Sequence, residues 1–154
     1  MKKVLKITLI IILVIFIILQ IIPNKLPENS DNYSKDLIEV ENPPEEVEVI
    51  LLKACYDCHS NHTEYPWYSY VAPVSWLVAK DVIEGREELN LSEWSEQSKR
   101  RKIKILSEMA EEIEEGKMPL QVYTITHRNA ILSDNEIEII TSWTRSLSNE
   151  ILGD

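Results

Sequence analysis

Both cysteines of the chain and one of its three histidines stand in a single short segment, C-Y-D-C-H at residues 55–59. Two thiols three residues apart lie on adjacent turns along one side of a helix, and the imidazole follows directly after the second thiol. This order is the one by which a polypeptide attaches a c-type haem: Cys55 and Cys58 add across the two vinyl groups, and His59 binds the iron as proximal ligand. The segment therefore predicts one covalently bound haem c per chain.

Three other chemistries use paired cysteines. A structural zinc site needs four Cys or His ligands, and only His62 and His127 remain to complete a set with the two thiolates. A redox-active dithiol places C-x-x-C at the start of a helix that follows a strand, whereas the residues before Cys55 have the pattern of a helix that ends there. A disulfide would close a very small loop and leave His59 without a role. These alternatives remain open, but each explains less of the segment than haem attachment does.

A second part of the same site is predicted further along the chain, in Gly116-Lys117-Met118-Pro119. Pro119 keeps the chain from returning to helix at this point, so the thioether of Met118 can be presented from an extended segment. A thioether is a soft ligand suited to the iron face opposite a histidine. Met118 is therefore the predicted distal ligand. His127, which would give bis-histidine ligation, is the alternative, and Met109 is a further methionine candidate.

The N-terminal segment has the length and composition of a membrane anchor. Residues 4–22 contain only three polar side chains, and as a helix of 19 residues they would extend about 28 Å, close to the hydrocarbon thickness of a bilayer. No small-residue cleavage site follows, which favours an uncleaved anchor over the alternative, a cleaved signal peptide. Lys2, Lys3 and Lys6 are expected to stay in the cytoplasm. The prediction is a single-pass protein of the inner (cytoplasmic) membrane, with its C-terminal domain in the periplasm or outside the cell.

The charge of the chain argues against one class of partner. All 26 acidic residues follow residue 22, together with 13 of the 16 Lys and Arg residues, so the part after the anchor has a net charge of −13. Nucleic-acid binding requires a basic face and is not expected. A charge this negative either only solvates the surface or also steers basic partners toward it.

Beyond the anchor at residues 1–22, the pattern predicts an all-α fold: a small cytochrome c-like bundle of about four helices around the haem. Residues 23–42 mix Pro, Asn, Ser and charge and are expected to be a flexible spacer. The haem-binding domain is expected at residues 43–148, with a C-terminal tail at 149–154. Its four helices are expected from Pro43, capped by Asn42, to Cys55, from Pro73 to residues 85–90, from a cap at Ser92 to Gly116, and from a capping box at Ser133 and Glu136 onward.

Two stretches between these helices have distinct expectations. Residues 65–70 contain four aromatic side chains, which would either cover the haem edge or fill the core. Residues 122–125 are expected to be at most a short extended piece.

The chain resembles a small class I c-type cytochrome and, more narrowly, the bacterial haem-binding domain family of membrane-anchored proteins. The resemblance covers about residues 43–148. It is carried by C-Y-D-C-H-S-N at 55–61, Tyr65-Pro66-Trp67-Tyr68, Pro73 with Trp76, Gly116-Lys117-Met118-Pro119, and His127-Arg128-Asn129-Ala130 before Leu132-Ser133. It implies a haem cofactor and a helical fold more firmly than it implies a reaction.

Electron transfer between redox partner proteins is the function that these observations favour. Iron held by His59 and Met118 has no open position, and no catalytic triad, phosphate loop or paired-carboxylate site accompanies the motif, so the chain is not expected to be an enzyme. The alternative is a haem-based ligand sensor with an open iron site. A zinc or dithiol module without haem is the third hypothesis.

Overall fold

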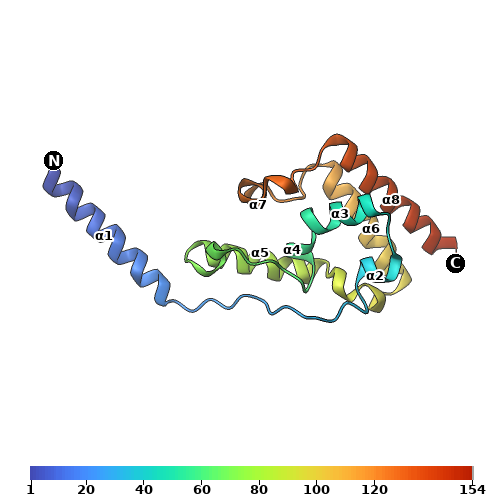
Figure 1. Cartoon of the computed structure of the whole chain (residues 1–154), viewed down its shortest axis with the longest axis horizontal. Helices are drawn as coiled ribbons and strands as arrows, with labels where there is room; N and C mark the ends of the chain where they lie inside the picture. Colours follow the sequence, from blue (N-terminus) through green and yellow to red (C-terminus); the bar gives the residue numbers. More distant parts are fainter. Residues whose placement is uncertain (154) are drawn as a thin grey trace.

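The computed structural model describes residues 1–153, which form eight α-helices and three 3₁₀-helices without a β-strand. The predicted all-α fold is thereby confirmed, and α1 stands apart from a small bundle made by the other helices (Figure 1). The α-helices are α1 (Lys2–Ile21), α2 (Leu37–Glu41), α3 (Glu45–Ala54), α4 (Tyr56–His59), α5 (Val74–Glu88), α6 (Lys99–Glu114), α7 (Gln121–Thr126) and α8 (Asp134–Gly153). The 3₁₀-helices are η1 (Trp67–Tyr70), η2 (Leu91–Glu96) and η3 (Arg128–Ala130).

The core of the bundle lies where α3, α6 and α8 meet, with α6 and α8 forming the most extensive helix pair. The apolar face predicted for the first domain helix is confirmed, because Val47, Ile50 and Leu51 of α3 are all at most 2% exposed. Trp94 of η2 is completely buried and donates its indole N–H to the carboxylate of Glu41. Other buried members of this core are Leu37, Tyr56, Leu91, Ile105, Leu106, Ile113, Ile140 and Leu147.

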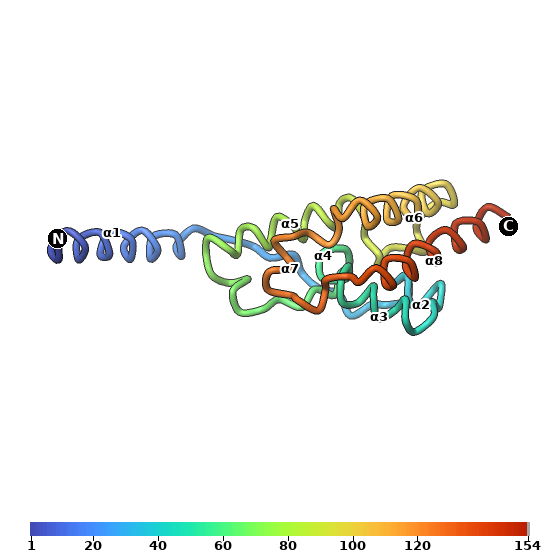
Figure 2. The backbone as a smooth tube through the Cα atoms, turned by 90° about the horizontal axis from the view of Figure 1, so that it is seen from above, coloured from blue at the N-terminus to red at the C-terminus, as the bar shows by residue number. Residues whose placement is uncertain are grey.

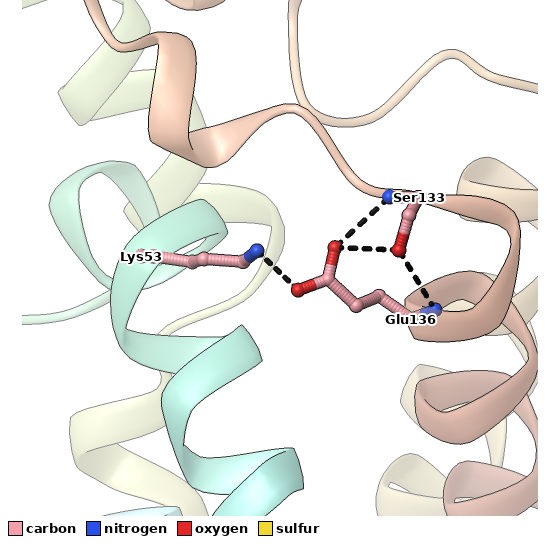
Figure 3. Close-up of polar contacts among 3 residues, drawn as sticks. All are labelled: Lys53, Ser133 and Glu136. Carbon is pink, nitrogen blue, oxygen red and sulfur yellow. Dashed lines mark hydrogen bonds and ion pairs between the residues drawn. The ribbon is translucent and has the colours of Figure 1, made fainter.

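The start of α8 confirms the predicted capping box. The carboxylate of Glu136 accepts hydrogen bonds from the backbone N–H of Ser133 at 2.9 Å and from its hydroxyl at 3.0 Å (Figure 3). The other oxygen of Glu136 lies 2.5 Å from Nζ of Lys53 on α3. One carboxylate therefore caps α8 and also joins it to the helix that leads into Cys55.

Three local expectations were wrong. Asn42 does not cap the first domain helix; it ends α2 instead, in the left-handed conformation at φ 44°. The helix expected from Ser92 begins later, because Ser98 accepts the capping hydrogen bond from the backbone N–H of Arg101. Residues 122–125, expected to be extended, lie within the short helix α7.

Residues 23–42 differ from the expected flexible spacer. They run as an extended strap beside the domain, as the two views in Figures 1 and 2 agree, and end in α2, where Leu37 is fully buried in the core. Several hydrogen bonds hold the strap in place, including one from Asn29 Nδ2 to the carbonyl oxygen of Thr63 at 2.7 Å. The residues expected to form a C-terminal tail also differ, since α8 continues to Gly153.

Candidate haem site

The C-x-x-C-H segment lies at a break between two helices. α3 ends at Ala54, Cys55 has φ −122° and ψ −43°, and α4 then supplies a single helical turn that ends at His59. The backbone N–H of His59 donates to the carbonyl oxygen of Cys55 at 2.9 Å. This turn places Cys55 and His59 on the same side of the chain, next to the end of α5.

The imidazole of His59 is fixed by the end of α5. Its Nδ1 lies 2.8 Å from the carbonyl oxygen of Gly85 and 3.2 Å from that of Leu89. Carbonyl oxygens only accept, so Nδ1 carries the proton and Nε2 keeps its lone pair. Burial lowers the pKa of His59, with a smaller opposing effect from the two carbonyl groups, so the neutral form that binds metals is favoured.

One cavity of about 350 Å³ brings Cys55, His59 and Met118 together. Most of its remaining lining is apolar and comes from α3, the end of α5, α6 and the segment before α8. These residues are Ala54, Leu89, Ile105, Met109, Ile113, Pro119 and Leu132, with the carboxylate-bearing Glu88, Glu108 and Glu112 also in the lining. An imidazole and a thioether beside an apolar space are side chains that can hold a haem iron.

Met118 reaches this cavity because of the way α6 ends. Gly116 adopts φ 67°, a left-handed conformation that favours glycine after a helix, and its N–H donates to the carbonyl oxygen of Ile113. The backbone N–H groups of Lys117 and Met118 then both donate to the carbonyl oxygen of Glu112, at 2.9 and 3.1 Å. The chain is thereby folded back over the last turn of α6, and the half-buried side chain of Met118 packs against the core cluster.

Both thiols are free and half-buried. Burial raises the pKa of Cys55 and that of Cys58 to about 12, and the nearby carboxylates of Asp57 and Asp81 contribute at Cys58. Cys58 is not among the residues that line the cavity; its backbone lies against α5, where a side chain at position 85 would have no room. The structure thus groups Cys55, His59 and Met118 around one cavity and places Cys58 against α5, outside that lining.

His127, the alternative distal ligand, lies elsewhere. Its ring stacks on Tyr123 with ring centroids 4.1 Å apart, and its Nε2 is 3.4 Å from the hydroxyl oxygen of Tyr68. Together with Asp57 and Tyr65 it lines a different hollow, which does not include His59. Met109, the other methionine candidate, does line the cavity with Met118.

Two carboxylates that support the motif, one buried and one half-buried, were not found from the sequence. Asp36, only 1% exposed, accepts hydrogen bonds from the hydroxyl groups of Tyr56 at 2.5 Å and Ser92 at 3.1 Å. Asp57 accepts one from the hydroxyl of Tyr123 at 2.7 Å. Burial and these carboxylates raise the pKa of both tyrosines, so the phenols remain protonated donors. Tyr56 and Asp57 are the two residues between the cysteines. Each is held by a hydrogen bond to a residue distant in the sequence, Tyr56 by Asp36 and Asp57 by Tyr123.

The aromatic residues at 65–70 do not line the cavity. Tyr65 faces the other hollow, and its hydroxyl donates to the carbonyl oxygen of Pro27 at 2.9 Å. Trp67 and Tyr70 are exposed, and Tyr68 donates to Thr126 Oγ1 of α7. The expected cover over the haem edge or plug in the core is thus absent from the described residues of this loop.

A family model described as a haem-binding domain matches residues 14–146. The match covers most of the chain, including the strap, the C-x-x-C-H segment and Met118. This protein therefore belongs to the haem-binding domain family, and haem is its cofactor. No curated protein and no solved structure shows significant similarity to the chain.

Proposed function

We propose that this protein is a membrane-anchored c-type cytochrome that carries single electrons between redox partner proteins. The observation that carries the proposal is the meeting of Cys55 and His59, from the C-x-x-C-H segment, with Met118, about sixty residues later in the chain, around one apolar cavity. Cys55 and Cys58 would each add a thiol across a vinyl group, the sulfur bonding to one carbon and the hydrogen going to the other. This addition leaves two thioether bonds and involves no net change in electron count.

His59 would bind the iron through Nε2, since Nδ1 is occupied by the carbonyl oxygens of Gly85 and Leu89. Hydrogen bonds from the other ring nitrogen of a histidine ligand fix the ring orientation and raise the basicity of the ligating nitrogen. Met118 would be the second ligand that holds the iron, and His/Met ligation would favour a raised reduction potential. Haem would supply the one-electron chemistry, and an iron held by both His59 and Met118 would leave no position for a substrate. We therefore propose electron transfer rather than catalysis.

The location that fits this chemistry is the outer side of the cytoplasmic membrane. α1 is long and apolar enough to cross a bilayer, and none of its residues is buried in the structure. The lysines at positions 2, 3 and 6 favour a cytoplasmic N-terminus. The acidic domain would then lie in the periplasm or outside the cell, where thiols can be matured to thioethers.

Expression of the full chain with a cytochrome c maturation system tests this proposal. After denaturation, the intact mass is expected to exceed that of the polypeptide by one haem, and replacement of Cys55 and Cys58 by serine is expected to abolish the increase. The reduced spectrum should not change on addition of carbon monoxide, because His59 and Met118 would both hold the iron. A colourless protein of polypeptide mass would overturn the proposal, and a spectrum altered by carbon monoxide would favour a ligand sensor instead.

A further inference from the structure

The end of α1 is joined to the domain by a pair of reciprocal hydrogen bonds. The side-chain carbonyl of Gln20 accepts from the backbone N–H of Ala72 at 3.0 Å, and its amide group donates to the carbonyl oxygen of Ala72 at 3.0 Å. Four residues later, Asn24 donates to the carbonyl oxygen of Ser75 at 2.8 Å. The last turn of the apolar helix is therefore attached to the segment that connects η1 to α5, and both views show this end of the domain beside the end of α1 (Figures 1 and 2).

The strap that follows α1 adds further attachments along the domain, as far as Arg86 in the last turn of α5. The carbonyl oxygen of Pro27 accepts from Tyr65, and that of Glu28 accepts from a guanidinium N–H of Arg86 at 2.8 Å. Ser30 donates its backbone N–H to the carbonyl oxygen of Asn61 at 2.9 Å. A strap with bonds at successive residues does not behave as a free tether, so the domain keeps a defined position relative to α1.

The surface next to this junction carries large exposed side chains. Trp67 is 77% exposed and Tyr70 is 68% exposed, both on η1, and Val74 at the start of α5 is 43% exposed. Trp67 and Tyr70 belong to the two residue types that are enriched where a membrane meets water, since each has an apolar ring and a polar atom at its edge. Neither residue lines the cavity that the proposed function assigns to haem.

The position of this surface follows from the length of the span. α1 has 20 residues and a length of about 30 Å, equal to the hydrocarbon thickness of a bilayer. With the N-terminal lysines at the cytoplasmic face, Gln20 lies at the opposite boundary of the hydrocarbon, and the residues bonded to it lie at the same level. The domain carries a large negative charge, so an aromatic contact suits a zwitterionic headgroup layer better than an electrostatic contact with anionic lipid would.

We propose that the surface formed by Trp67, Tyr70 and Val74 inserts into the outer headgroup region of the bilayer that α1 spans. The domain then lies on the membrane in one orientation, because two neighbouring contacts hold it there: the end of α1 and this aromatic surface. This inference rests on the membrane anchoring that is part of the proposed function. It adds a second membrane contact, made by residues outside the anchor.

Lipid photocrosslinking tests the second contact. The full-length, haem-loaded protein is reconstituted in phosphatidylcholine vesicles containing a phosphatidylcholine with a diazirine at the top of one acyl chain, irradiated, and mapped by mass spectrometry. Crosslinks are expected on α1 and on residues 67–74, the latter several-fold above those at Tyr33, which is 50% exposed but lies further along the strap. Absence of crosslinks at residues 67–74 would overturn the inference.

Two variants test whether the crosslinks at residues 67–74 depend on the aromatic side chains and on the attachment to α1. The double substitution Trp67→Ser and Tyr70→Ser should remove the crosslinks at residues 67–74 and leave those on α1 and the haem spectrum unchanged, because both side chains are largely exposed. Gln20→Leu keeps the span apolar but removes the reciprocal hydrogen bonds to Ala72, and it should lower the crosslinks at residues 67–74 several-fold. Crosslinks confined to α1 would leave the anchor intact and reject only the second contact, whereas their absence from α1 as well would reject the proposed anchor too.

Discussion

Gly85 of α5 lies directly against the backbone of Cys58: a Cβ atom added at Gly85 would be 2.6 Å from the carbonyl oxygen of Cys58. The contact is between two backbone segments, so no flexible side chain can move aside. The same residue offers its own carbonyl oxygen to His59 at 2.8 Å. A single glycine therefore sets both the distance between α4 and α5 and the orientation of the predicted proximal ligand.

Gly85→Ala is expected to lower the free energy of unfolding by about 1–2 kcal/mol. Overpacking costs about 1–3 kcal/mol, which exceeds the gain of up to about 1 kcal/mol from placing alanine in a helix. Urea unfolding of the full chain in detergent measures the change. Gly153→Ala is the matched control, because a Cβ there meets nothing within 4 Å. Equal stabilities of the two variants would show that α4 can move away from α5 at little cost.

Met118→Ala is expected to remove the methionine-to-iron charge-transfer band of the ferric protein while the haem stays attached through Cys55 and Cys58. The reason is that Met118 shares the cavity with His59, whereas His127 lies in a different hollow. His127→Ala should accordingly leave the band unchanged. The absorption spectrum of each oxidised variant is the measurement.

Met109 also lines the cavity and needs its own control. Met109→Leu keeps the apolar volume and should preserve the band, since Met118 is the expected ligand. If the band survived in Met118→Ala and disappeared in Met109→Leu, the distal ligand would be Met109.

The fold was predictable from the sequence where the causes are local. The apolar face of α3 follows from helical spacing, and the capping box of α8 joins Ser133 to a residue three positions away. The hydrogen bonds to the buried carboxylate of Asp36 could not be predicted, because its partners Tyr56 and Ser92 are 20 and 56 residues distant in sequence. For the same reason the polar strap looked like a free spacer, although tertiary hydrogen bonds hold it against the domain.

The candidate site, like the fold, was predictable only where its signal is local in the sequence. The chemistry of Cys55, Cys58 and His59 is visible in five consecutive residues, but the carbonyl oxygens that orient His59 come from the end of α5 and carry no side-chain signal. The exposure of Trp67 and Tyr70 could not be predicted either, because aromatic residues in a loop are compatible with a core, a cofactor or a membrane surface.

Tyr56→Phe is expected to lower the free energy of unfolding by about 1.5–3 kcal/mol, the range for a hydrogen bond to a charged group. The phenol donates to Asp36 inside the core, where the tyrosine is 5% exposed and water cannot replace the lost donor. Urea unfolding gives the difference. Tyr33→Phe is the control, because Tyr33 is half exposed and its hydroxyl makes no hydrogen bond to the described residues. A Tyr56→Phe protein as stable as the control would show that Ser92 and the backbone satisfy Asp36 alone.

The Lys53–Glu136 pair predicts a stability difference that depends on pH. The hydrogen bond from Lys53, together with those from Ser133, lowers the pKa of Glu136 from 4.5 to about 2. A carboxyl whose pKa is lower in the folded than in the unfolded state stabilises the fold above the unfolded value and loses that contribution as the pH falls. The stability advantage over Glu136→Gln should therefore be full above about pH 5 and decline between there and pH 2.

The size of this advantage is limited by solvent, because the side chains of Lys53 and Glu136 are 19% and 26% exposed. We expect about 1 kcal/mol at neutral pH, measured by urea unfolding of both proteins across the pH range. Comparing variants at each pH cancels the titration of groups that they share. In a Lys53→Met background, the loss of stability caused by Glu136→Gln should shrink to the part contributed by Ser133. A pH dependence of equal size in both backgrounds would assign the effect to the capping box and remove Lys53 from it.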